Sequence, residues 1–129
     1  MTVSEAICSV LAGLVPVAGG AVGEHRCYPD ALPEADGPPA VPAIVYQQVG
    51  GRSIELLDAE VPDLRNARVQ ITSWARTRLE ADVLAEQVDA AMRRAPGLQA
   101  TPLGEAIGRY DNDIKLRGCS QDFSIWLPR

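Results

Sequence analysis

The stretch Arg68–Ala81, RVQITSWARTRLEA, passes from a strand pattern to a helix pattern without a loop between them. Its first eight residues alternate between two faces, as in a strand with one buried side. One face carries Val69, Ile71, Ser73 and Ala75, and the other carries Arg68, Gln70, Thr72 and Trp74. Thr77 and Glu80 then match a capping box, which satisfies the first amide donors of a helix. This stretch therefore predicts a strand that leads directly into a helix, which ends at Pro96-Gly97.

Elements with clear boundary signals are predicted on both sides of this corner. A second capping box, Thr2-x-x-Glu5, precedes apolar residues at helical spacing and predicts a helix over about Val3–Val15. Ala43–Val49 has strand composition and ends at Gly50-Gly51, a hairpin signal, so the stretch after it is a candidate returning strand. Cys119–Leu127 alternates as a strand, and one further strand is expected between Leu98 and Tyr110.

This order of elements predicts an α+β fold. We expect an antiparallel sheet of four to five strands with two helices packed on one face. At 129 residues the chain is one ordinary domain, residues 1–129, that needs no metal or disulfide to fold. Five prolines with acidic residues between them predict an exposed, stiff loop at residues 28–42.

Composition and charge exclude several classes of function. The net charge is −5, and the Lys and Arg residues are scattered, so no basic stripe grips a nucleic acid backbone. The three cysteines, Cys8, Cys27 and Cys119, are far apart and odd in number, which favours a reduced, intracellular protein. His25 and Cys27 are spaced like two zinc ligands, but His25 is the only histidine, so loop residues or buried thiols are the expected role.

The uncharged N-terminal stretch Ala6–Gly23 has the appearance of a signal-peptide core or a short membrane span. Glu5 is acidic where a signal peptide carries Lys or Arg, and five Gly and Pro residues interrupt any helix that would cross a bilayer. A short buried helix followed by a Gly-rich turn is the better reading. No association with a membrane is expected.

The long helix has apolar residues on two sides. The broad stripe that should pack on the sheet consists of Ala81, Leu84, Ala85, Val88, Ala91 and Met92. A second, narrow group of apolar residues lies about opposite to this stripe, within a charged face. It consists of Leu79, Val83 and Ala90 and is here called the ridge. A narrow apolar ridge of this kind fits a contact with another chain, while a few exposed aliphatic residues of ordinary type are the alternative.

Aromatic residues are predicted on the sheet face that the helices leave uncovered. If Val69 shares the covered face with Phe123, the far face carries Trp74, Trp126 and, in one register of the first strand, Tyr46. Large rings among polar residues are typical of a protein interface. The alternative is that a loop of the same subunit, such as residues 28–42, covers them.

No catalytic motif is present in the sequence. There is no G-x-S-x-G, no H-E-x-x-H and no phosphate-binding Gly loop. Asp111-Asn112-Asp113 begins like a calcium loop but lacks the later ligands, so a hairpin turn is predicted there. We therefore expect no enzyme activity, no catalytic residue, no cofactor and no metal site.

Four stretches carry a resemblance to a known family. They are CYPD at 27–30, PAIVYQQVGG at 42–51, ARVQITSWARTRLEADVLAEQVDAAM at 67–92 and SQDFSIWL at 120–127. In this order they resemble the tail completion, or tail terminator, family of long-tailed bacteriophages and gene transfer agents. Together with the opening helix they span nearly the whole chain. Residues 30–42 match no pattern of that family.

The resemblance implies a structural virion protein without enzyme activity or cofactor. Such a protein forms a homo-oligomeric ring, here expected to be a hexamer, that caps the completed tail tube and docks onto a head-closure (neck) protein. DNA passes through its channel without sequence-specific binding, and the protein is located in the tail-neck region after assembly in the host cytoplasm. The alternatives are another small head-closure or minor tail component, a ferredoxin-like cytosolic module that binds a ligand or partner, and an unrecognised hydrolase.

Overall fold

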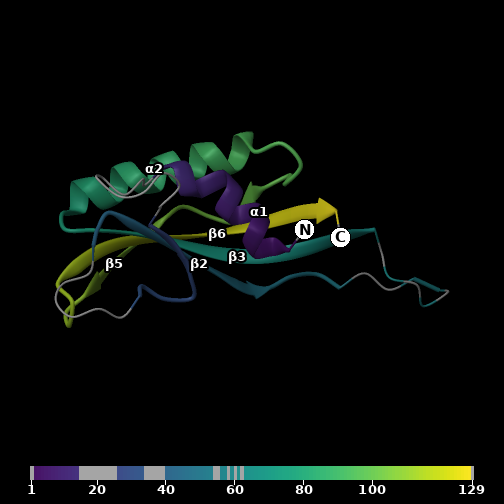
Figure 1. Cartoon of the computed structure of the whole chain (residues 1–129), viewed down its shortest axis with the longest axis horizontal. Coiled ribbons are helices and arrows are strands. Elements are labelled where there is room, and N and C mark those ends of the chain that lie inside the picture. Colours follow the sequence, from purple (N-terminus) through teal and green to yellow (C-terminus); the bar gives the residue numbers. More distant parts are fainter. Residues whose placement is uncertain are drawn as a thin grey trace.

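The computed structural model describes residues 2–14, 26–33, 40–53, 56–57, 59, 61 and 63–128. It contains two helices, α1 (Val3–Leu11) and α2 (Arg78–Arg94), and six strands. The strands are β1 (Cys27–Pro29), β2 (Ala43–Gly50), β3 (Leu64–Ala75), β4 (Thr101–Pro102), β5 (Ile107–Asp111) and β6 (Leu116–Pro128). Both helices lie on one face of the sheet (Figure 1). The α+β fold predicted from the sequence is confirmed.

The sheet differs from the prediction in its strand number and direction. The strand order is β1-β2-β3-β6-β4, and β5 also pairs with β6. β1 runs parallel to β2, so the six-stranded sheet is mixed and not purely antiparallel. The start of the predicted loop at residues 28–42 is therefore wrong, because Tyr28 and Pro29 belong to β1. Residues 34–39 of that loop lie outside the described residues.

β3 itself is the strand that returns from the glycines at the end of β2. It pairs antiparallel with β2 from Arg68 to Trp74 and with β6 along its whole length. Among residues 52–58, those that the structure describes are not in a strand, so this part of the sequence prediction is wrong. Because β3 lies between β2 and β6 and pairs with both, it is the central strand of the sheet.

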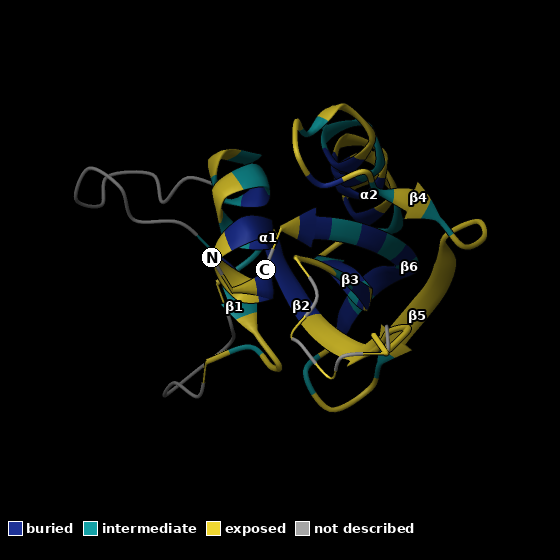
Figure 2. Ribbon diagram, turned by 90° about the vertical axis from the view of Figure 1, so that its right-hand side faces the viewer, coloured by how far each residue is buried: buried dark blue, intermediate teal, exposed yellow. Residues whose placement is uncertain are grey.

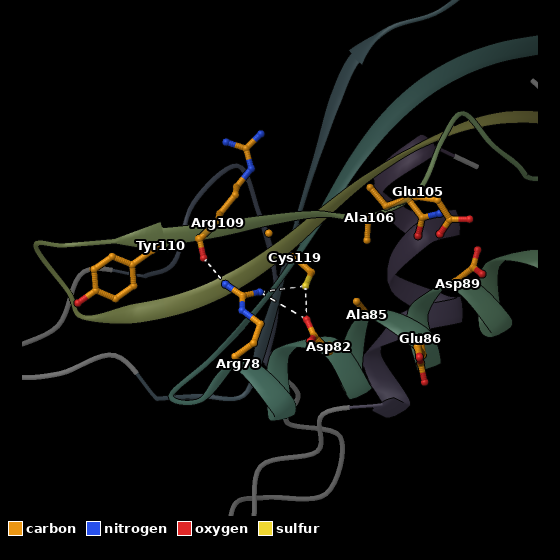
Figure 3. A pocket seen from close by; sticks show the side chains of 12 residues that line it. Arg78, Asp82, Ala85, Glu86, Asp89, Glu105, Ala106, Arg109, Tyr110 and Cys119 are labelled. Atoms are coloured by element: carbon orange, nitrogen blue, oxygen red, sulfur yellow. Dashed lines mark hydrogen bonds and ion pairs between the residues drawn. The ribbon is translucent and has the colours of Figure 1, made fainter.

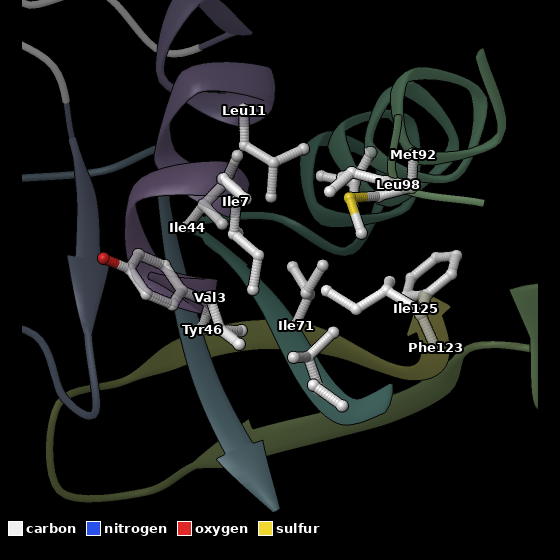
Figure 4. Close-up of a cluster of buried hydrophobic side chains, with 14 of the residues drawn as sticks. Val3, Ile7, Leu11, Ile44, Tyr46, Ile71, Met92, Leu98, Phe123 and Ile125 are labelled. Carbon is white, nitrogen blue, oxygen red and sulfur yellow. The ribbon is translucent and has the colours of Figure 1, made fainter. Parts of the chain in front are cut away.

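The core lies between the sheet and the two helices (Figure 4). Its fully buried side chains come from α1, β2, β3, α2 and β6, and they include Ile7, Leu11, Ile44, Val69, Ile71, Met92, Phe123, Ile125 and Leu127. Burying one such side chain contributes about 1.5–3 kcal/mol. The alternation of β3 and β6 and the broad stripe of α2 thus fill the core as the sequence predicts.

Side chains fix where the two helices begin. In α1 the Thr2 hydroxyl accepts from the Glu5 amide at 3.1 Å, and the Glu5 carboxylate accepts from the Thr2 amide at 2.9 Å. In α2 the Thr77 hydroxyl accepts from the Glu80 amide at 3.2 Å, and only this half of the box forms. Within the described residues, no helix is long and apolar enough to cross a membrane.

Candidate interaction surfaces

The ridge on α2 is exposed at its N-terminal end. Leu79 is 73% exposed and Val83 is 45% exposed, while Ala90 is half-buried. The corner between β3 and α2 has only two residues, Arg76 and Thr77, so the phase of α2 follows directly from the end of β3. With Leu84 and Val88 buried against the sheet, Leu79 and Val83 must face away from it.

Trp74 and Trp126 lie on the sheet face away from the helices, and both are half-buried. Trp74 pairs with Gly118, whereas Trp126 pairs with Asn66, at the other end of the β3–β6 ladder. Eight residues of strand separate these two positions, which corresponds to about 27 Å. The two indole rings are thus separate features and do not form one aromatic layer.

Tyr46 does not lie on that face, so the register that would have placed it there is not the one that forms. In the observed register Tyr46 pairs with Ile71, which points into the core. Tyr46 is only 6% exposed and packs with the core below α1 (Figure 4). Burial, together with the nearby thiols of Cys8 and Cys27, raises the pKa of its hydroxyl. The far face of β2 instead carries Ala43, Val45 and Gln47.

Polar pairs occupy the middle of the far face. The hydroxyls of Thr72 and Ser120 are 2.8 Å apart, and Arg109 donates from Nε to the Ser120 hydroxyl at 2.6 Å. Arg68 and Asp122 form an ion pair at 2.7 Å further along the same face. Because an unpaired buried hydroxyl is costly, the pairing of Thr72 with Ser120 stabilises the polar region between the two Trp side chains.

A cleft of about 610 Å³ separates α2 from β5 (Figure 3). Arg78 spans it, donating from Nη1 to the Gly118 carbonyl at 2.9 Å and from Nη2 to the Arg109 carbonyl at 2.8 Å. The Cys119 thiol donates to the Asp82 carboxylate at 3.0 Å. Burial and the adjacent Asp82 raise the pKa of that thiol, so Cys119 is not an activated nucleophile.

The other residues considered for metal or redox chemistry are Cys8, Cys27 and His25. Burial and the neighbouring Cys8 raise the pKa of the Cys27 thiol to about 12. Cys8, Cys27 and Cys119 form no disulfide. Within the described part of the chain, no three His, Cys, Asp or Glu side chains are placed to hold a metal ion. His25 lies outside the described residues.

Sequence reasoning placed Trp74, Trp126, Leu79 and Val83 on exposed faces, but it missed the arginine that ties β5 to α2. Arg78 contacts residues 31 and 40 positions away along the chain. Such contacts leave no local signal in the sequence, because an arginine in the first turn of a helix has the same pattern when it points into solvent.

The fold combines a well-packed core with exposed apolar side chains on α2 and half-buried Trp side chains on the far face of the sheet. The model of the family described as Tail completion protein gp17 matches residues 6–127, so the chain belongs to this family. It is therefore a structural protein of a bacteriophage tail and interacts with other tail proteins of the virion. The resemblance drawn from the sequence is confirmed. No curated protein sequence matches the chain.

Proposed function

We propose that this protein assembles into a six-membered ring that caps the completed tail tube and joins it to a head-closure protein. The observation that carries the proposal is the ridge on α2, where Leu79 and Val83 remain exposed on a helix whose other face is buried. A ring needs two different patches on each subunit, so that one subunit meets the next head to tail. The ridge and the far face of the sheet, with Trp74 and Trp126 at its two ends, are the candidate patches.

The negative charge of the chain is consistent with a channel through which DNA passes without binding to the protein. The net charge is −5, and the surface of α2 carries Asp82, Glu86 and Asp89. Like charge discourages persistent contact with the phosphate backbone. In this proposal the ring acts without catalysis or a cofactor, is assembled in the host cytoplasm, and stays in the neck of the virion.

Native mass spectrometry and negative-stain microscopy of the purified protein test the proposal. The protein is studied alone and with tail tubes from a terminator-deficient lysate. We expect rings of six subunits, either free or at one end of each tube. The proposal is wrong if the protein stays monomeric and does not bind tube ends at any tested concentration. Rings that bind tubes but fail to recruit the head-closure protein would contradict the joining role alone.

A further inference from the structure

Each side of the sheet has an open stretch of strand at its edge. On one side, β5 pairs with β6 alone, and four of its five residues are exposed. On the other side, β1 covers only Ile44–Tyr46 of β2. Gln47–Gly50, the free half of β2, is exposed and, among the described residues, has no strand on the side away from β3. Unpaired main-chain donors and acceptors at such edges are templates for pairing with another chain.

β5 is fixed from both faces, although its outer edge is open. On the helix side, Arg78 donates to the Arg109 carbonyl at 2.8 Å (Figure 3). On the far side, the Arg109 guanidinium donates to the Ser120 hydroxyl at 2.6 Å. A strand that is already ordered loses less conformational entropy when a partner binds. β5 is thus a preorganised edge.

Proline, which blocks an edge strand, is present in β1 but not at the two open edges. β1 carries Pro29, which cannot donate a main-chain hydrogen bond, so the edge of β1 is blocked there. Neither β5 nor the free half of β2 contains Pro, although β5 carries the charged Arg109 and Asp111 and the register of β2 shifts between Gln48 and Gly50. Both expose large side chains, with Ile107 64% exposed, Tyr110 52% and Val49 44%.

We propose that β5 of one copy pairs with the free half of β2 of the next copy, which joins the sheets of neighbouring subunits. The inference rests on the proposed ring, because only a head-to-tail arrangement brings two different edges together in every contact. It places the contact between neighbouring subunits at the sheet edges, so that the ridge and the far face are not the two surfaces that meet in this pairing. The open edges are on opposite sides of one sheet, which suits such a repeat. They also match in length, since five residues of β5 meet four of β2. The pairing covers Val49 and Ile107 and satisfies both edges.

Cysteine cross-linking between two variants tests the pairing. Gln47 and Ile107 both point to the far face, because Gln47 pairs with Gln70 and Ile107 pairs with Ser120. Gln47→Cys protein mixed with Ile107→Cys protein, and separately with Arg109→Cys protein, should give a disulfide-linked dimer under mild oxidation. The matched control is Gln48→Cys, since Gln48 is also exposed but faces the helix side. Unmodified protein reports any reaction of the native cysteines.

The outcomes separate this pairing from the ring itself. Cross-linking of Gln47→Cys with a β5 variant, at least several-fold above the Gln48→Cys control, supports the pairing. If rings form without cross-linking, the strand pairing is wrong and the proposed ring stands. If neither rings nor cross-linked dimers form, the strand pairing and the proposed ring are both wrong. A disulfide-linked dimer of Ile107→Cys protein alone would show that β5 pairs with β5 of another copy, which also contradicts the proposed pairing of β5 with β2. As a second measurement, Ile107→Lys should weaken ring assembly about tenfold, whereas Leu103→Lys, outside the strand, should not.

Discussion

The pairing of Trp74 with Gly118 shows how one residue fixes the position of another. A Cβ added at Gly118 would lie 2.9 Å from Trp74 Cε3, which is closer than real Cβ contacts. We expect Gly118→Ala to lower the free energy of unfolding by about 1–3 kcal/mol, as for other overpacked sites. Urea unfolding measures this change. Gly108→Ala is the matched control, because its nearest neighbour, Arg78 Nη1, is at an ordinary 3.5 Å. Equal effects of the two substitutions would contradict the proposed crowding.

Because of the Cys27 thiol, we expect the free energy of unfolding to fall at alkaline pH. Its pKa in the folded protein is raised from 9.0 to about 12, first by burial and then by Cys8. Above pH 9 the unfolded state loses this proton before the folded state does, so stability is full below pH 9 and falls as the pH rises toward 12. Urea unfolding under reducing conditions at pH 8 and pH 10.5 should show this fall. Cys27→Ala should reduce the pH dependence, and an unchanged pH dependence in the variant would refute the assignment.

Single residues also show what the sequence could and could not predict. The alternation of β3 and β6 placed Val69, Phe123, Trp74 and Trp126 on their correct faces, because a strand has a period of two residues. The face of Tyr46 depends on the register of β2 against β3, which alternation within β2 does not reveal. A shift of one residue exchanges all side chains between the two faces of a strand.

At the scale of the element, Arg78 is expected to hold β5 in place. Arg78→Met keeps an unbranched, apolar side chain but removes the donors to the Arg109 and Gly118 carbonyls. We expect faster amide hydrogen exchange in Ile107–Asp111, while exchange in the middle of α2 is unchanged. Arg93→Met is the control, because Arg93 pairs with Asp89 on the same helix and does not reach β5. Equal exchange of β5 in the two variants would rule out this role.

The ridge makes a separate prediction for α2. Leu79→Glu introduces a charge at a site that is 73% exposed, so it should leave the melting temperature nearly unchanged. If the ridge contacts a neighbouring subunit, the buried charge should abolish ring assembly in native mass spectrometry. Gln87→Glu adds the same charge at another exposed position of α2 and should assemble normally. Normal rings from Leu79→Glu would exclude the ridge from the interface.

Elements with strong local signals were predictable, and elements defined by their partners were not. The caps and apolar stripes of α1 and α2 and the long alternation of β3 and β6 are properties of the local sequence. β1 is three residues long and β4 is two, and each is a strand only because a longer neighbour offers free main-chain groups. For the same reason the sequence suggested a loop where β1 forms a parallel pair.

At the scale of the whole molecule, the two Trp side chains should serve different contacts. They lie at opposite ends of the far face, and each is half-buried within the monomer. We expect Trp74→Ala and Trp126→Ala each to reduce ring assembly more than they reduce the melting temperature of the monomer, and to do so independently, since distant sites are usually additive. The single and double variants are compared by native mass spectrometry and thermal unfolding. Loss of folding in a free monomer would instead assign that Trp to the core.

The two-residue corner at Arg76-Thr77 has a consequence for how chains of this type can vary in length. Each residue added to a helix turns everything after it by about 100°. One extra residue in the first turn of α2, directly after this corner, would therefore rotate Leu84 and Val88 away from the sheet and bring other side chains against it. Insertions of three or four residues nearly restore the rotation, since a helical turn has 3.6 residues. Insertions in this first turn that keep the core intact are therefore expected in steps close to a whole helical turn.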